Sequence, residues 1–299
     1  MMRTIKGIMP VLPTPFTDEG EKIDISAFKQ LVQVAAQDGA HALCLFAAGA
    51  EFYKLSQDER YTLFEAALDA NEQGLPLVAT VSSHATMLAA EEARYYERKG
   101  AAAINIMPPS FAGPTQGMIA DHIIEIARAV DIPLIIQYAP ALTGQVILAD
   151  TFSRIGNAGR ELYIKLEASP TGPAITALRQ QTRDQYGIIV GNGGECMFEA
   201  LERGACAVMP GAATIPIFRK IYDAYASGDT LKAFTLFNRF LPHIHFMLRD
   251  IESFVALEKI ILHHRGVIGN SICRRPCKEI DAYTRQLLDR HLAYLRELG

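Results

Sequence analysis

The sequence predicts an α/β fold, a (β/α)8 TIM barrel followed by a C-terminal helical extension. Eight short apolar stretches alternate with stretches whose apolar residues recur at a helical period. This alternation indicates a parallel sheet, because each parallel pair of strands needs a crossover helix, and eight such units close into a barrel. After residue 209 the alternation stops and helical stretches follow. We therefore expect the barrel over residues 1–214 and the extension over residues 215–299.

The first half of the chain contains five strand–helix units with recognisable boundaries. Each strand is a short apolar run, and several of the runs begin at a glycine or proline. Ser56 and Glu59 form a capping box that opens a helix, Gly100 ends a helix, and Pro114 opens another. The expected strands cover residues 7–11, 42–46, 76–81, 102–106 and 133–137. The expected helices cover residues 23–37, 56–74, 86–99, 114–129 and 149–155.

The second half supplies three more strands and the remaining helices. The expected strands cover residues 162–166, 187–190 and 206–209. The expected helices cover residues 172–183, 196–203, 216–227, 230–249, 251–264 and 277–298. A doubly wound open sheet is the alternative fold, but no G-x-G-x-x-G motif follows the first strand to support it.

Composition excludes several classes of protein. The 299 residues are 49% hydrophobic and 21% charged, with a formal net charge of −4, which is typical of a soluble globular protein. The mildly acidic balance gives no support for nucleic-acid binding. No apolar run reaches the ~18 residues that span a bilayer, and the first residues contain no long apolar segment typical of a signal peptide. We expect a cytoplasmic protein without a membrane partner.

The cysteines indicate neither a disulfide framework nor a metal site. Cys44, Cys196, Cys206, Cys273 and Cys277 are odd in number and widely scattered. The last two form a lone C-x3-C pair without a second pair at zinc-ligand spacing, and no histidine lies at such a spacing from carboxylates. We expect no metal.

One lysine interrupts the apolar run that forms the sixth strand. Lys165 lies near the end of this run, and burying a lysine is costly. An ion pair with Glu167, two residues further on the same strand face, is one explanation. The other is chemistry: desolvation lowers the pKa of a lysine in an apolar site, and the neutral amine attacks a carbonyl to form a Schiff base. The strand alone leaves both open.

Other candidate site residues follow from the rule that barrel active sites lie at the carboxyl ends of the strands. Strand two ends in the Ala-Ala-Gly-Ala-Glu loop at residues 47–51, strand three at His84, and strand seven in a Gly-Asn-Gly-Gly loop at residues 191–194. Strand five ends at Tyr138. Because strands five and six are neighbours, we expect the Tyr138 and Lys165 side chains to converge. His84 is more typical of a hydrogen-bonded residue at the barrel rim.

These motifs resemble the dihydrodipicolinate synthase/N-acetylneuraminate lyase family of Schiff-base aldolases, over nearly the whole chain. The similar segments are the opening Gly-Ile-Met-Pro-Val-Leu-Pro-Thr-Pro-Phe at residues 7–16, the loop ending at Glu51, Tyr138, Lys165 and the glycine loop at residues 191–194. The resemblance implies a lyase without a cofactor that acts on pyruvate or another 2-keto acid. It also implies a homo-oligomer, either a tetramer or a dimer.

The resemblance also implies a role for each site residue. Lys165 would attack the C2 carbonyl and form an iminium, and Tyr138 would shuttle protons. The backbone N–H groups of Ala48, Gly49 and Ala50 would hold the keto-acid carboxylate. The remaining site residues would be Gly191 and Asn192, which would line the site, and Glu167, as an extra acid–base group or as the ion-pair partner of the lysine.

The chain departs from this family's pattern at three places. The family loop usually reads Gly-Thr-Thr-Gly-Glu, so both threonines are missing here. A second tyrosine expected after strand four is absent, and Phe111 is among the residues that stand there. Leu142 is near the place of an arginine that true dihydrodipicolinate synthases carry. These departures favour aldol cleavage or dehydration of a 2-keto-3-deoxy sugar acid. The alternatives are an authentic 4-hydroxy-tetrahydrodipicolinate synthase, a phosphate-dependent barrel enzyme that uses the Gly191 loop, and a non-catalytic keto-acid-binding barrel.

Overall fold

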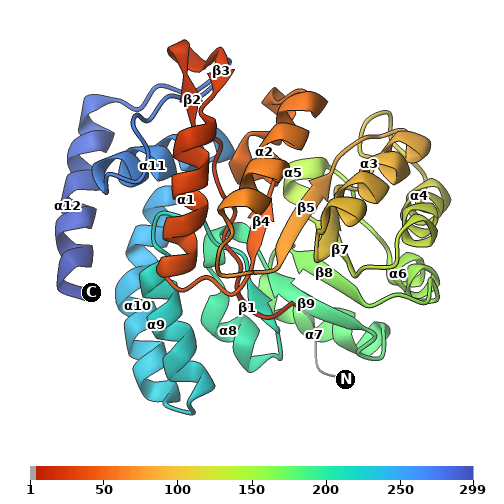
Figure 1. Cartoon of the computed structure of the whole chain (residues 1–299). Coiled ribbons are helices and arrows are strands. Elements are labelled where there is room, and N and C mark those ends of the chain that lie inside the picture. The colour runs from red at the N-terminus through yellow and green to blue at the C-terminus, as the bar shows by residue number, and fades with distance from the viewer. Residues whose placement is uncertain (1–4, 299) are drawn as a thin grey trace.

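The computed structural model describes residues 5–298 and contains a closed barrel of eight parallel strands (Figure 1). The barrel strands are β1 (Gly7–Ile8), β4 (Leu43–Leu45), β5 (Leu77–Val81), β6 (Ala103–Ile106), β7 (Leu134–Tyr138), β8 (Leu162–Leu166), β9 (Tyr186–Val190) and β10 (Ala207–Val208). Their hydrogen-bonded order is β1-β10-β9-β8-β7-β6-β5-β4. The ring closes where Val11, beyond β1, forms parallel bridges with Cys44 and Gly211. The predicted TIM barrel is therefore confirmed.

Helices surround the barrel, and three more form the C-terminal extension (Figure 1). The surrounding helices are α1 (Ile25–Gln37), α2 (Gln57–Ala70), α3 (Thr86–Lys99), α4 (Gln116–Ala129), α6 (Ala149–Gly156), α7 (Thr171–Gln181), α8 (Met197–Glu202) and α9 (Ile215–Ala226). The extension consists of α10 (Thr230–Met247), α11 (Ile251–His264) and α12 (Ala282–Leu298). The helix α9 packs against β1 of the barrel and against α10 of the extension. Because these contacts join α9 to both parts, the domain boundary at residue 214 stays a prediction.

Several local elements differ from the expected ones. A short antiparallel hairpin, β2 (Phe16–Thr17) with β3 (Lys22–Ile23), precedes α1, and a one-turn helix α5 (Pro140–Thr143) follows β7. The last helix begins at residue 282 and not at 277, because the Asp281 side chain caps it by accepting a hydrogen bond from the Thr284 N–H at 2.8 Å. The predicted capping box of Ser56 and Glu59 is present and opens α2.

Alternation along the strands separates two sets of buried side chains. One set fills the barrel interior and includes Met9, Cys44, Ile135 and Tyr163. The other lies between the strands and the outer helices and includes Ile136. Successive strand residues point to opposite faces, so a one-residue step decides whether a side chain faces the interior or the helices.

The extension is joined to the barrel by a buried carboxyl group. Glu258 of α11 accepts a hydrogen bond from the Ala213 N–H at 2.9 Å, just after β10. Gly211 lies so close to the same carboxyl that a side chain there would overlap it. Burial raises the pKa of Glu258 to about 7, although backbone hydrogen bonds and the positive charge of Arg265 oppose that rise.

This raised pKa predicts a specific pH dependence of stability. The folded chain binds the Glu258 proton more tightly than the unfolded chain, whose pKa is near 4.5, so the contribution is complete below that pH and lost as pH rises through about 7. At ~1.4 kcal/mol per pH unit the loss amounts to about 3 kcal/mol. Denaturant unfolding at pH 5 and pH 8 checks this. Glu258→Gln is expected to flatten the difference, and an unchanged pH profile in that variant would contradict the assignment.

None of the described helices is long and apolar enough to cross a membrane. Within the part of the chain that the structure describes, no three His, Cys, Asp or Glu side chains gather as the ligands of a metal ion would.

Candidate active site

A cavity of about 420 Å³ opens at the carboxyl ends of the barrel strands. Lys165 and Glu167 lie in its wall, together with Ala48 and Gly49 from the loop after β4. The extension closes the other side through the junction of α10 and α11, at residues 248–251 and 254. The predicted lysine therefore meets a cavity at the expected end of the barrel.

Lys165 and Glu167 form an ion pair inside this cavity. The Lys165 Nζ lies 3.1 Å from the Glu167 Oε1, and the lysine side chain is only 5% exposed. The same Oε1 accepts a hydrogen bond from the Asn192 N–H at 3.0 Å, and Oε2 accepts one from the Gln137 Nε2 at 3.0 Å. Three donors from three different strands or loops thus hold the carboxylate beside the amine.

The glycine at the end of β9 makes this arrangement possible. A side chain at Gly191 would overlap the Glu167 carboxylate, so the backbone approaches that group directly. The next residue, Asn192, lines the cavity, and its side chain donates to the Glu195 carboxylate at 2.8 Å. Because this loop already lies between two carboxylates, the structure does not favour the phosphate site that the glycine loop suggested.

The predicted role of Tyr138 is wrong in geometry. The register of β7 and β8 places Gln137 opposite Lys165 and Tyr138 opposite Leu166. Tyr138 therefore faces the helices, where its ring packs edge-on against Phe152 of α6 at 5.4 Å between centroids. It is not among the residues that line the cavity. The physical reason is the two-residue period of a strand, since a one-residue shift along β7 reverses the face.

Gln137 occupies the place predicted for the phenol, and sequence reasoning missed it. It is buried, faces the barrel interior, and donates to Glu167 as described above. Its Oε1 has no hydrogen-bond partner among the described residues, and Gln137, like Tyr138, is not among the residues that line the cavity, so its contact with the site runs through Glu167. The sequence alone carries no signal for it, because Leu134, Ile135 and Ile136 are all apolar, and only the observed position of Ile135 in the barrel interior leads by steps of two to residue 137.

A conservative substitution tests this correction. Tyr138→Phe is expected to leave turnover within about threefold of wild type, because a phenol on the outer face takes no part in proton transfer to a group inside the barrel. Steady-state kinetics on the same substrate measure it. Gln137→Leu is the matched comparison, and we expect it to lower turnover by about 10-fold or more, because one of the hydrogen bonds that hold Glu167 is lost. A larger loss of turnover in Tyr138→Phe than in Gln137→Leu would show that Tyr138 belongs to the site.

The loop proposed to bind the substrate carboxylate contributes only in part. Ala48 and Gly49 line the cavity, whereas Ala50 is buried and does not. The Ala50 N–H donates to the Ala47 carbonyl oxygen at 2.8 Å. The structure therefore does not bring Ala50 to the cavity, and anion binding by the Ala48 and Gly49 N–H groups stays a prediction.

A buried ion-pair network holds this loop. Glu51, in a left-handed conformation with φ of 58°, is fully buried and forms an ion pair with Lys259 of α11. Lys54 Nζ is 3.1 Å from the other oxygen of the same carboxylate, and the Arg274 N–H donates to that oxygen at 3.2 Å. The Lys259 ammonium also lies 4.4 Å from the centre of the Phe16 ring. The extension therefore fixes the conformation of the cavity loop.

His84 lies apart from the site. It lines a separate surface hollow, with Arg60 and Ser82 among its other lining residues, and none of these three lines the Lys165 cavity. This placement agrees with the interpretation of His84 as a rim residue.

The chain resembles known proteins over nearly its whole length. A model of the dihydrodipicolinate synthetase family matches residues 4–294. The chain belongs to this family. It is 29% identical to an L-2-keto-3-deoxyarabonate dehydratase from Azospirillum brasilense, covering 98% of this chain and 94% of the relative. It is 27% identical to a 4-hydroxy-tetrahydrodipicolinate synthase from Methanopyrus kandleri, covering 97% and 96%.

Solved structures of the family share the fold. The crystal structure of dihydrodipicolinate synthase from Rhodopseudomonas palustris superposes with a TM-score of 0.89 at 24% identity, over 97% of each chain. This likeness shows the fold, and the family model over residues 4–294 confirms the predicted family membership. Because the named relatives include both a dehydratase and a synthase, the family alone does not choose between dehydration and condensation.

Proposed function

We propose that this family member is a Schiff-base lyase that dehydrates a 2-keto-3-deoxy sugar acid through an imine on Lys165. The observation that carries the proposal is the Lys165–Glu167 pair in the cavity, 3.1 Å apart, with an amide and not a phenol opposite the lysine. A carboxylate beside the nucleophile supplies the proton transfers that the tyrosine was expected to supply.

The first half of the reaction forms the imine. The Lys165 ammonium passes a proton to Glu167, and the neutral amine attacks the C2 carbonyl of the keto acid, after which a proton moves from the nitrogen to the C2 oxygen. The protonated Glu167 then gives its proton to the C2 hydroxyl, the C2–O bond breaks with water as the leaving group, and the iminium forms. The N–H groups of Ala48 and Gly49 hold the C1 carboxylate at the edge of the cavity.

The second half removes water from C3 and C4. Glu167 takes a proton from C3 and gives an enamine, with the iminium as the electron sink. The C4–O bond then breaks as the protonated Glu167 returns its proton, so the hydroxyl leaves as water and a C3–C4 double bond forms. Addition of water to C2 releases the unsaturated keto acid and restores the amine. One carboxyl thus acts as base and then as acid, and Gln137 positions it by donating a hydrogen bond to it.

Condensation with a second acid is less well supported. Leu142 and Ala141 line the cavity near the place where a synthase of this family carries an arginine, and neither pairs with a second carboxylate. The relatives named as synthases keep authentic 4-hydroxy-tetrahydrodipicolinate synthase as the alternative. A homo-oligomer and a cytoplasmic location stay predictions.

The decisive experiment is reductive trapping across a panel of keto acids. Pyruvate and 2-keto-3-deoxy acids of five and six carbons are each incubated with the protein and borohydride, and the adduct is mapped by peptide mass. We expect an adduct on Lys165 with the whole panel, and a rise in unsaturated product only with the 3-deoxy sugar acids. Absence of any adduct on Lys165 excludes the mechanism. Adducts without product release would favour a non-catalytic keto-acid-binding barrel.

Glu167→Gln separates imine formation from the later proton transfers. We expect the variant still to form the borohydride adduct, though more slowly because Glu167 no longer accepts the lysine proton, while turnover of the 3-deoxy acid falls by about 10²–10⁴-fold. The amide keeps the size and an acceptor for the Asn192 N–H but cannot carry the proton. Glu195→Gln, which alters the carboxylate on the far side of Asn192, serves as the control and is expected to keep turnover near wild type. Equal losses in both variants would contradict an acid–base role for Glu167.

A further inference from the structure

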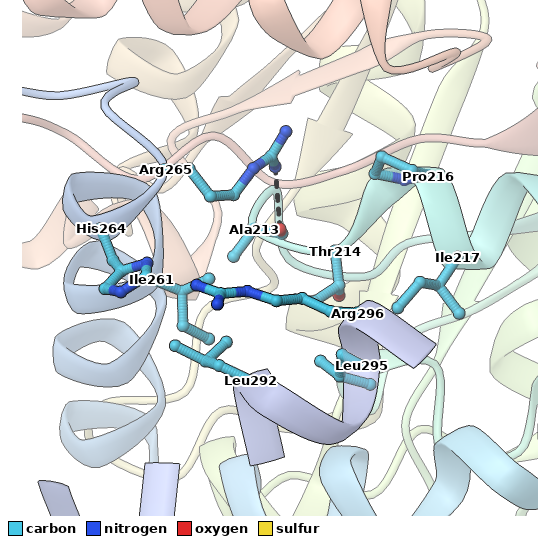
Figure 2. A pocket seen from close by; sticks show the side chains of 10 residues that line it. All are labelled: Ala213, Thr214, Pro216, Ile217, Ile261, His264, Arg265, Leu292, Leu295 and Arg296. Carbon is cyan, nitrogen blue, oxygen red and sulfur yellow. Dashed lines mark hydrogen bonds between the residues drawn. The ribbon is translucent and has the colours of Figure 1, made fainter. Parts of the chain in front are cut away.

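A second cavity, of about 310 Å³, lies between the barrel and the extension (Figure 2). The segment after β10, the end of α11 and the last turns of α12 surround it. None of its lining residues lines the Lys165 cavity. Its apolar side chains come from all three parts and are Ile217, Ile261, Leu292 and Leu295.

The charged side chains at this second cavity are two arginines. Its lining contains Arg265 and Arg296, together with His264 and, among the described residues, no aspartate or glutamate. Arg265 is already engaged, because it donates to the Ala213 carbonyl oxygen at 2.8 Å and to the Asp38 carboxylate at 2.7 Å. Within residues 5–298, no hydrogen bond or ion pair joins Arg296 or His264 to a carboxylate.

The position of Arg296 brings this free charge over the apolar wall. Figure 2 shows its side chain running from α12 toward the side of the cavity that His264 and Ile261 line. A guanidinium pairs with carboxylates through two parallel hydrogen bonds, and the neighbouring aliphatic side chains favour a ligand that removes apolar surface from water. Inorganic phosphate would satisfy the charge but would leave the apolar wall uncovered.

We propose that this cavity binds a small organic acid with a branched or aromatic hydrocarbon body. Its carboxylate would pair with Arg296, and its body would lie against Ile217, Ile261 and Leu295. The cavity is near the lower limit of small-ligand pockets, which are roughly 300–1,000 Å³, so a compact acid fits better than a long chain.

Such a ligand would act on the segment that leads to the active site. Ala213 lies in the wall, and its N–H and carbonyl oxygen are held by Glu258 and Arg265 of the extension. Met209 and Pro210, a few residues earlier, line the Lys165 cavity. Occupancy therefore fastens α11 and α12 to this segment, and ligand binding to the folded state raises the temperature of unfolding.

The test compares four probes by thermal denaturation and hydrogen exchange. The probes are 4-methylpentanoate, benzoate, the neutral 4-methylpentanamide and inorganic phosphate. We expect the two acids to raise the melting temperature saturably and to protect residues 213–217 and 292–296 from exchange. Arg296→Gln is expected to weaken their apparent affinity about tenfold, because a charged hydrogen-bonding partner is lost. Arg290→Gln, exposed on the same helix but outside the cavity, is expected to bind as wild type does.

Four outcomes would overturn the proposal. Equal binding of the amide would remove the need for a carboxylate, and equal binding of phosphate would remove the need for a hydrocarbon body. Protection confined to residues 48–50 would place the acids in the Lys165 cavity. An Arg296→Gln variant with unchanged affinity would dissociate binding from this arginine; because the side chain is exposed, its melting temperature without ligand should match wild type and exclude misfolding as the cause.

Discussion

Replacing Lys165 with arginine is expected to abolish the borohydride adduct and to lower turnover by about 10⁴-fold or more. Loss of a covalent nucleophile removes the entire imine pathway, and substitutions of this kind in other enzymes cost factors of that order. Arginine keeps a positive charge beside Glu167 but stays protonated, so its guanidinium does not attack a carbonyl. The variant thus separates nucleophilic chemistry from simple charge pairing.

The chain provides an internal control for this result. Lys259 is the most buried lysine, but its amine is bonded to Glu51 and to the Ile272 carbonyl oxygen, and it belongs to the network outside the cavity. Peptide mapping should therefore find no adduct on Lys259 in either protein. An adduct that persists in Lys165→Arg at any other lysine, with turnover retained, would show that the nucleophile had been assigned to the wrong residue.

The barrel could be predicted from sequence because its signals are local. A two-residue or 3.6-residue period is contained in each segment, and a capping box such as Ser56 with Glu59 marks its boundary without reference to the rest of the chain. The hairpin of β2 and β3 was missed because strands of two residues carry no periodicity. The predicted start of α12 is too early because residues 277–280 contain no glycine or proline that would break the helical pattern before the capping group, Asp281.

The site was predictable only where the residue type itself is unusual. A lysine in an apolar strand required an explanation, and Lys165 with Glu167 supplied one because both lie on one strand face. Tyr138 is predicted from residue type and family pattern. Because Leu134, Ile135 and Ile136 are all apolar, the two-residue period does not select the interior face, and only the register with β8 places Gln137 there.

The contacts of Glu51 could not be predicted at all. Its partner Lys259 lies 208 positions away in sequence, on a helix whose other buried residues include Val255 and Leu262. A lysine in such a helix is ordinarily assigned to the solvent-exposed face, and no local pattern connects it with a loop of the barrel. Only the packing of α11 on the barrel brings the two charges together.

This network carries the second large prediction. Lys259→Met is expected to lower the free energy of unfolding by about 3–5 kcal/mol, because the fully buried Glu51 carboxylate loses a buried partner. Burial lowers the pKa of Lys259, and the negative charge of Glu51 opposes that shift, so each of the two charges stabilises the other inside the protein. Denaturant unfolding measures the loss. Lys29→Met, which breaks an exposed pair with Asp69, is the matched control and should leave stability nearly unchanged.

The same substitution also tests how the extension serves catalysis. If Glu51 fixes the loop that presents the Ala48 and Gly49 N–H groups, then Lys259→Met raises the Michaelis constant for keto acids under conditions where the protein is still folded. Adding Glu51→Gln to that variant removes the unpaired charge and should restore part of the stability, because a neutral amide is cheaper to bury than an isolated carboxylate. It should not restore the Michaelis constant, because Lys259 would still be missing from the loop's anchorage. Recovery of both the stability and the Michaelis constant would show that the network stabilises the fold but takes no part in substrate binding.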